Sequence, residues 1–176
     1  MSVSSHLTPD PERRLWIIHA RVQELLALND RRLWLFLFLA IAQILLVRFA
    51  SPGGVLAYIS ILLLAPALPL GAFAVSPFLE RSCSLPLKGL DDAGKGRAYS
   101  LLNERDLAGF TQADLTITLD KYLGGGVTAT PYYEDIIGQI VLGARAVVRK
   151  QFLLKVLCAI VFAGQLLFLT SILFRT

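Results

Sequence analysis

Residues that build catalytic centres and metal sites are scarce in this chain. Its 176 residues include two cysteines and two histidines. Cys83 and Cys158 stand apart and share no metal-binding or redox spacing, so we interpret both as packing residues. No serine, histidine and aspartate pattern marks a nucleophile, and the glycines at 124–126 lack the Lys-Ser/Thr of a phosphate-binding loop. The sequence therefore predicts no enzyme, no metal site and no cofactor.

Charge is also scarce, at 17% of residues, and it is almost missing from three long apolar runs, Leu33–Ala50, Val55–Val75 and Phe152–Phe174. Arg48 lies near the end of the first run and Lys155 near the start of the third. Each run is close to the ~20 residues that a helix needs to cross a hydrocarbon core. A soluble core does not explain three such runs in so small a chain. The sequence thus predicts an all-α membrane protein with three transmembrane helices.

Lysine and arginine are distributed unevenly around these runs. Most of them lie before the first run or between the second and third, and few lie in the link around 51–54 or in the C-terminal tail. Cytoplasmic segments of membrane proteins carry the excess of positive charge. This rule places the N-terminus and the segment 76–151 in the cytoplasm, and the link and the C-terminus on the other side.

Local start signals order the N-terminal half of the chain. Residues 1–10 are predicted to be disordered, and Pro11 is a favourable first residue for a helix. Apolar residues then recur at helical spacing, so residues 11–32 are predicted to form an amphipathic cytoplasmic helix that continues into the first span. Pro66 and Pro69 are expected to kink the second span.

The segment between the second and third spans is predicted to be a small, mainly helical domain. Thr111, with Asp114 three residues later, resembles a capping box that opens a helix to about Leu123. Pro131 begins a last helix that meets no stop signal before Phe174, so it is predicted to be long and continuous. The predicted organisation is a disordered segment 1–10, the amphipathic helix 11–32, a first span 33–50, a second span 55–75, a cytoplasmic ligand-sensing domain 76–151 and a third span 152–174.

Three polar residues interrupt the spans and are candidates for lining a pore. Gln43, Lys155 and Gln165 are costly in lipid and are expected to face protein or water. Hydrogen bonds between helices explain the two glutamines equally well, and Lys155 can extend to the cytoplasmic interface instead. Three helices do not enclose a pore, so conduction would require several copies, for which we predict a homotetramer.

A group of basic residues is the candidate phosphate-binding site. Arg145, Arg149 and Lys150 have no acidic residue downstream of Asp135 to neutralise them. A belt on anionic lipid headgroups explains Arg149 and Lys150 as well as a phosphate ligand does. The residues predicted to bind a nucleotide phosphate are Arg145, Arg149, Lys150, Lys121, Lys95 and Arg97.

Three stretches carry a resemblance to a known family: ARVQELLALNDRRLWLFLFL (Ala20–Leu39), LLNERDLAGFTQADLTITL (Leu101–Leu119) and YYEDIIGQIVLGARAVVRKQFLLKVLCAIVFAGQLLFL (Tyr132–Leu169). In pattern and spacing they resemble the transmembrane effectors of bacterial antiphage nucleotide signalling, specifically the Pycsar effector family. The Gly-rich stretch 86–97 and the triple glycine are unlike a typical member.

The resemblance implies an ion channel or pore in the bacterial inner membrane, with its C-terminus in the periplasm. A cyclic nucleotide or a short single-stranded oligonucleotide would gate it, supplied by a partner nucleotidyltransferase or cyclase. In the similar Hailong systems a short single-stranded DNA holds the effector shut. The expected outcome is membrane depolarisation and growth arrest as antiphage defence. Two rivals stay open, namely a non-conducting membrane scaffold and a subunit of a membrane enzyme complex.

Overall fold

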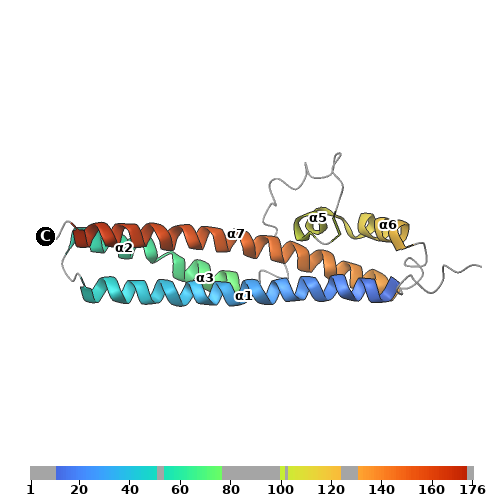
Figure 1. Ribbon diagram of the computed structural model, residues 1–176, viewed down its shortest axis with the longest axis horizontal. Coiled ribbons are helices and arrows are strands. Elements are labelled where there is room, and N and C mark those ends of the chain that lie inside the picture. Colours follow the sequence, from blue (N-terminus) through green and yellow to red (C-terminus); the bar gives the residue numbers. More distant parts are fainter. Residues whose placement is uncertain (1–10, 51–53, 77–99, 102, 124–130, 174–176) are drawn as a thin grey trace, which may run out of the picture. The chain divides into compact units, whose positions relative to one another are not determined.

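The computed structural model describes residues 11–50, 54–76, 100–101, 103–123 and 131–173 (Figure 1). Helices make up 93% of these described residues, and no strand occurs among them. The prediction of an all-α chain is therefore confirmed for this part. The helices are α1 (Pro11–Ala50), α2 (Val55–Leu64), α3 (Ala67–Val75), α5 (Glu104–Gly109), α6 (Gln112–Leu123) and α7 (Pro131–Leu173).

The described helices belong to two compact units. The first unit comprises Met1–Ala27 and Ser84–Val148, and the second comprises Leu28–Cys83 and Arg149–Thr176. Helices α1 and α7 each contribute one part to the first unit and one part to the second. The division within α1 and α7 lies a few residues outside the first and third apolar runs of the sequence.

The first unit has a continuous apolar core built by α1, α5, α6 and α7. Leu15 and Val22 of α1 are buried in it, and Ile18 and Leu25 pack against it, as their helical spacing predicts. Leu115 and Leu119 come from α6 and Leu107 from α5. The apolar stripe of α7 completes the core with Tyr133, Ile136, Ile137, Ile140, Ala144 and Val147.

The start of α6 follows the predicted capping pattern. The Thr111 hydroxyl accepts a hydrogen bond from the Asp114 backbone N–H at 3.2 Å and donates one to the Asp114 carboxylate at 2.6 Å. An N-cap threonine satisfies a backbone donor that has no partner inside the helix. The predicted helix over residues 112–123 is confirmed.

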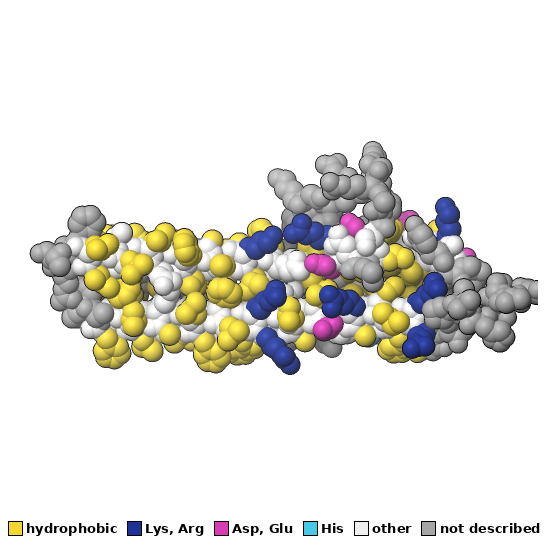
Figure 2. All heavy atoms as spheres, viewed as in Figure 1, with side chains coloured by type: hydrophobic (Ala, Val, Ile, Leu, Met, Phe, Trp, Pro, Cys, Tyr) yellow, Lys and Arg dark blue, Asp and Glu magenta, His cyan; other side chains and the backbone are white. Residues whose placement is uncertain are grey.

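The second unit is apolar outside as well as inside. Leu33, Ala40, Leu64 and Leu157 lie in its core, while Phe49 of α1 is 81% exposed. On the face shown in Figure 2, hydrophobic side chains cover most of the described helices of this unit. Three helical segments, Arg13–Phe49, Val55–Val75 and Pro131–Leu173, are long and apolar enough to cross a membrane.

The second candidate span is broken at Pro66, as predicted. Proline has no backbone N–H and its ring clashes with the preceding turn, so α2 ends at Leu64 and α3 begins at Ala67. The Leu68 N–H donates to the Ala65 carbonyl at 3.3 Å across the break. Pro69 lies in the first turn of α3, where a missing N–H breaks no helical hydrogen bond.

The predicted disorder of residues 1–10 falls outside the described residues. The Gly-rich stretch 86–97 and the glycines at 124–126 also lie outside them.

Candidate functional site

Arg145 projects from α7 onto the C-terminal end of α5 within the first unit. Its Nε donates to the Ala108 carbonyl at 3.2 Å and its Nη2 donates to the Phe110 carbonyl at 3.0 Å. The last carbonyls of a helix lack partners inside the helix, and a basic side chain can satisfy them. Arg145 therefore joins α5 to α7, using part of the donor capacity of a guanidinium. This pairing could not be predicted from the sequence, because the partners are backbone carbonyls distant from Arg145 along the chain.

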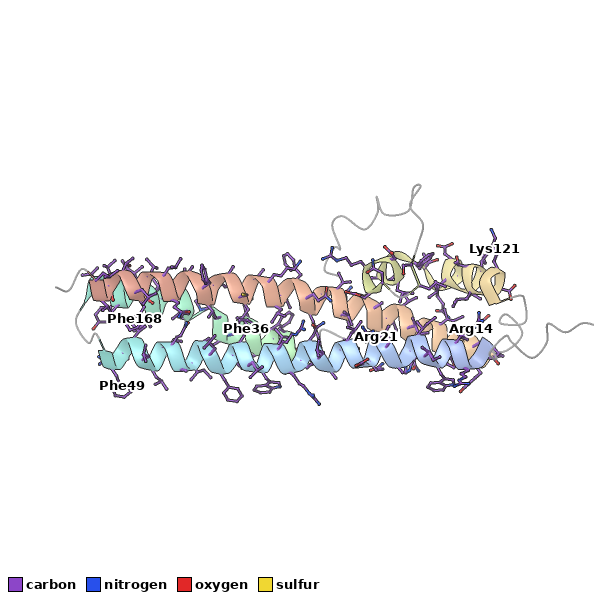
Figure 3. The ribbon with its side chains drawn as sticks, viewed as in Figure 1. Arg14, Arg21, Phe36, Phe49, Lys121 and Phe168 are labelled. Atoms are coloured by element: carbon purple, nitrogen blue, oxygen red, sulfur yellow. The ribbon has the colours of Figure 1, made fainter. Side chains whose placement is uncertain are left out.

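Lys121 lies in the last turn of α6 and is exposed. Figure 3 shows its side chain directed away from the helix. Lys95 and Arg97 lie outside the described residues, so their part in the predicted phosphate site stays a prediction. Arg145 and Lys121 belong to the first unit, whereas Arg149 and Lys150 belong to the second.

Lys150 is the one fully buried charged residue among those the structure describes. Its Nζ donates to Asp30 Oδ1 of α1 at 2.7 Å, and the side chains are 1% and 35% exposed. Both residues belong to the second unit. A buried ammonium is costly without an opposite charge, so Asp30 compensates the burial of Lys150. Asp30 precedes Lys150 by 120 residues. The sequence downstream of Asp135 therefore could not indicate this partner.

Within the described part of the chain, two donors on the residues that adjoin this ion pair in sequence have no acceptor. Asn29 adjoins Asp30, is 2% exposed, and its Nδ2 is buried without a hydrogen-bond partner. Arg149 adjoins Lys150 and is half-buried, and its Nε is likewise buried without a partner. A buried donor without an acceptor costs about 1–3 kcal/mol. We call Asn29, Asp30, Arg149 and Lys150 the polar cluster, and two of its donors find no acceptor among the described residues.

The two glutamines of the spans meet in the second unit. Gln43 Nε2 of α1 donates to Gln165 Oε1 of α7 at 3.2 Å. Gln43 Oε1 is buried and has no hydrogen-bond partner among the described residues, while Gln165 is exposed. The interhelical hydrogen bond that the sequence allowed is present, and a role for either residue in lining a pore stays a prediction.

The polar stripe of α7 lies largely on its exposed surface. Lys155, Cys158 and Gln165 are all exposed, spaced three or more residues apart on the helix. Phe162 and Leu169, at 62% and 49% exposed, lie on the same stripe. Residues at this helical spacing share one face. The described part of a single chain therefore leaves this mixed polar and apolar face exposed.

A third polar contact of the second unit was not foreseen. The Ser60 hydroxyl of α2 donates to the Gly164 carbonyl of α7 at 3.0 Å, and the bond is buried. Leu64, one turn further along α2, packs so closely on Gly164 that an added Cβ atom would lie 2.7 Å from its side chain. Small residues let membrane helices approach closely.

A shallow hollow in the first unit contains none of the predicted phosphate ligands. Its lining residues are Ile18, Arg21, Val22, Leu25, Leu101, Glu104 and Leu107. No group of three or more histidine, cysteine or acidic side chains able to hold a metal occurs in the part of the chain that the structure describes.

Comparison of the chain with protein-family models, with curated proteins and with solved structures finds no match. Functional assignment therefore depends on the physical features above and on the resemblance noted in the sequence.

Proposed function

We propose that this chain is a multi-pass protein of the bacterial inner membrane. The outward-facing apolar side chains of the second unit would contact lipid, because water would penalise so large an apolar surface. The excess of basic residues in the N-terminal segment and in the segment 76–151 supports a cytoplasmic location for both. The C-terminus would then lie in the periplasm.

Several copies would assemble into an ion channel, for which a tetramer is our preferred number. The observation that carries this proposal is the exposed stripe of α7, in which Lys155 and Gln165 interrupt an otherwise apolar surface. Polar groups facing hydrocarbon are unfavourable, so such a stripe is better placed against water or another copy. Around a shared axis, the stripes of several copies would line one path.

A nucleotide second messenger or a short oligonucleotide would gate this channel from the cytoplasm. Support comes from the basic residues of the segment 76–151, and α7 carries both Arg145 and the stripe. A ligand shifts a closed–open equilibrium only if it binds one state better than the other. Opening would depolarise the membrane and arrest growth, and the role in antiphage defence depends on the family resemblance alone.

Ion flux measured in proteoliposomes tests this proposal. The purified chain is reconstituted, and flux is recorded with and without cyclic mononucleotides and short single-stranded DNA. We expect flux that at least one of these ligands raises or lowers. Vesicles that contain correctly inserted protein but stay impermeable under every condition would contradict the channel.

A non-conducting scaffold is the second candidate, and one observation favours it. The hydrogen bond between Gln43 and Gln165 gives both residues a role in helix packing without any pore. Under this candidate, replacing both glutamines by leucine would weaken folding or assembly, while no variant would change ion flux.

A further inference from the structure

The second unit has a large imbalance of charge around the polar cluster. Asp30 is the one acidic residue among the residues of this unit that the structure describes. Its basic residues there are Arg31, Arg32, Arg48, Arg149, Lys150 and Lys155. Three of these six adjoin Asp30 in sequence or belong to the cluster itself, namely Arg31, Arg149 and Lys150. An anion of another molecule would therefore be attracted to this position.

The geometry points to an anion site that Asp30 closes: we propose that Asn29, Arg149 and Lys150 bind a phosphate group, and that the Asp30 carboxylate competes with this phosphate. Two donors in the cluster, Asn29 Nδ2 and Arg149 Nε, are buried and have no acceptor among the residues that the structure describes. One carboxylate contacts Lys150 at 2.7 Å and leaves those donors unsatisfied. A phosphate presents several charged acceptor oxygens, which suit an ammonium and a guanidinium on adjacent residues.

Asp30 is the movable member of the pair. Its side chain is 35% exposed, whereas that of Lys150 is 1% exposed. Rotation of the carboxylate into water would uncover Lys150 from that side and give an incoming anion access to the cluster. Without a bound anion, the Asn29 and Arg149 donors find no acceptor among the described residues. Replacing the Asp30 carboxylate by a phosphate that also reaches these donors is therefore favourable.

The phosphate has two possible sources with the same chemistry. The cluster adjoins the apolar runs, since Leu33 and Phe152 follow it closely in α1 and α7. In the proposed topology this is the depth of the cytoplasmic lipid headgroups, where basic residues attract anionic lipid. A free phosphate from the cytoplasm would meet the same donors. The inference deepens the proposed function because it specifies how two of its predicted phosphate ligands are controlled.

Anion binding by an Asp30→Asn variant is the decisive experiment. The full chain is placed in phosphatidylcholine nanodiscs, and its thermal unfolding is followed in two arms. One arm titrates inorganic phosphate against chloride at constant ionic strength, and the other replaces part of the lipid by phosphatidylglycerol. Removing a competing carboxylate should tighten apparent anion affinity by about tenfold in at least one arm. The responding arm identifies the source.

Glu24→Gln is the matched control, because Glu24 is also an acidic residue of α1 and pairs with Arg21 at 3.0 Å. Its anion affinity should equal that of the wild type. An Asp30→Asn variant that binds anions no more tightly than the wild type in both arms overturns the proposal. If that variant does not fold, Arg149→Gln in the native background decides. Loss of anion-dependent stabilisation supports the site, and full retention overturns it.

This experiment is separate from the test of conduction. A chain that gains anion affinity on loss of Asp30 but passes no ions would keep this inference and defeat the channel. A chain that conducts ions but gains no anion affinity on loss of Asp30 would keep the channel and defeat this inference.

Discussion

The Ser60 hydroxyl lies 3.0 Å from the Gly164 carbonyl oxygen and donates a buried hydrogen bond to it. This contact joins α2 to α7 at a point where Leu64 also packs directly on the glycine backbone. A helical carbonyl with a second acceptor site can take such a bond without losing its own helix partner. The lack of a side chain at residue 164 is therefore a packing requirement of the second unit.

Gly164→Ala should destabilise the protein by about 1–3 kcal/mol, because the new methyl group would lie 2.7 Å from the buried Leu64 side chain. Gly138→Ala in the same helix is the matched control. A Cβ atom there would lie 3.4 Å from Gln112, an ordinary contact, and alanine favours a helix over glycine by about 1 kcal/mol. Thermal unfolding in detergent should thus show opposite shifts for the two variants. Equal shifts would contradict the packing of α2 on α7.

Arg145→Gln should loosen α5, since it removes two charged hydrogen bonds to the Ala108 and Phe110 carbonyls. Each bond to a charged group contributes about 1.5–3 kcal/mol. Hydrogen exchange of the α5 amides should accelerate, whereas Lys121→Gln, at an exposed position, should leave it unchanged. Unchanged protection in the Arg145 variant would show that this arginine does not hold α5.

The same pair of variants separates structure from ligand binding. If both residues bind phosphate, each substitution should weaken binding of the nucleotide that controls flux, including the Lys121 substitution that leaves α5 intact. If only Arg145→Gln weakened nucleotide binding, we would attribute the effect to displacement of α5.

Loss of Asp30 and loss of Lys150 should have unequal effects on stability. Asp30→Asn leaves a buried ammonium without its carboxylate, which should cost about 2–3 kcal/mol after allowance for the partial exposure of the pair. Lys150→Met leaves a carboxylate that can turn to water, so the cost should stay below about 1 kcal/mol. Urea unfolding of both variants and of the double variant measures this difference. If Lys150→Met lost more stability than Asp30→Asn, Asp30 would not be the residue that compensates the burial of Lys150.

Gln165→Leu should lower ion flux by about tenfold if the exposed stripe of α7 lines the path, equivalent to about 1.4 kcal/mol in the barrier. The folding cost should be modest, near 0.6 kcal/mol, because the lost bond to Gln43 is a single interhelical contact. Leu166→Ala, on an adjacent exposed position, serves as the control and should leave flux unchanged. Equal flux in wild type and Gln165→Leu would remove this residue from the path.

Helix boundaries were the most predictable part of the fold. Pro11, Pro131 and the Thr111–Asp114 pair are local signals, and the helices begin within a residue of each. The break at Pro66 follows from the missing N–H in the same way. The apolar stripe of α1 in the first unit was also foreseen, because burial follows helical spacing within one element.

Contacts between helices were not predictable from one sequence. The Asp30–Lys150 ion pair and the Ser60–Gly164 hydrogen bond join residues more than 100 positions apart. Each depends on the register of two helices, which local spacing does not determine. Arg145 illustrates a further difficulty, since its partners are backbone carbonyls that any residue type would supply.

The location of the segment 76–151 on the same side of the membrane as the N-terminus is the central claim, and accessibility of single cysteines tests it directly. In a background with Cys83 and Cys158 replaced by serine, Lys121→Cys and Arg48→Cys are expressed separately and treated with a membrane-impermeant maleimide. We predict labelling of the Arg48→Cys variant in cells with a permeable outer membrane and an intact inner membrane. The Lys121→Cys variant should label only after the inner membrane is opened. Labelling of the Lys121→Cys variant while the inner membrane is intact would contradict the account.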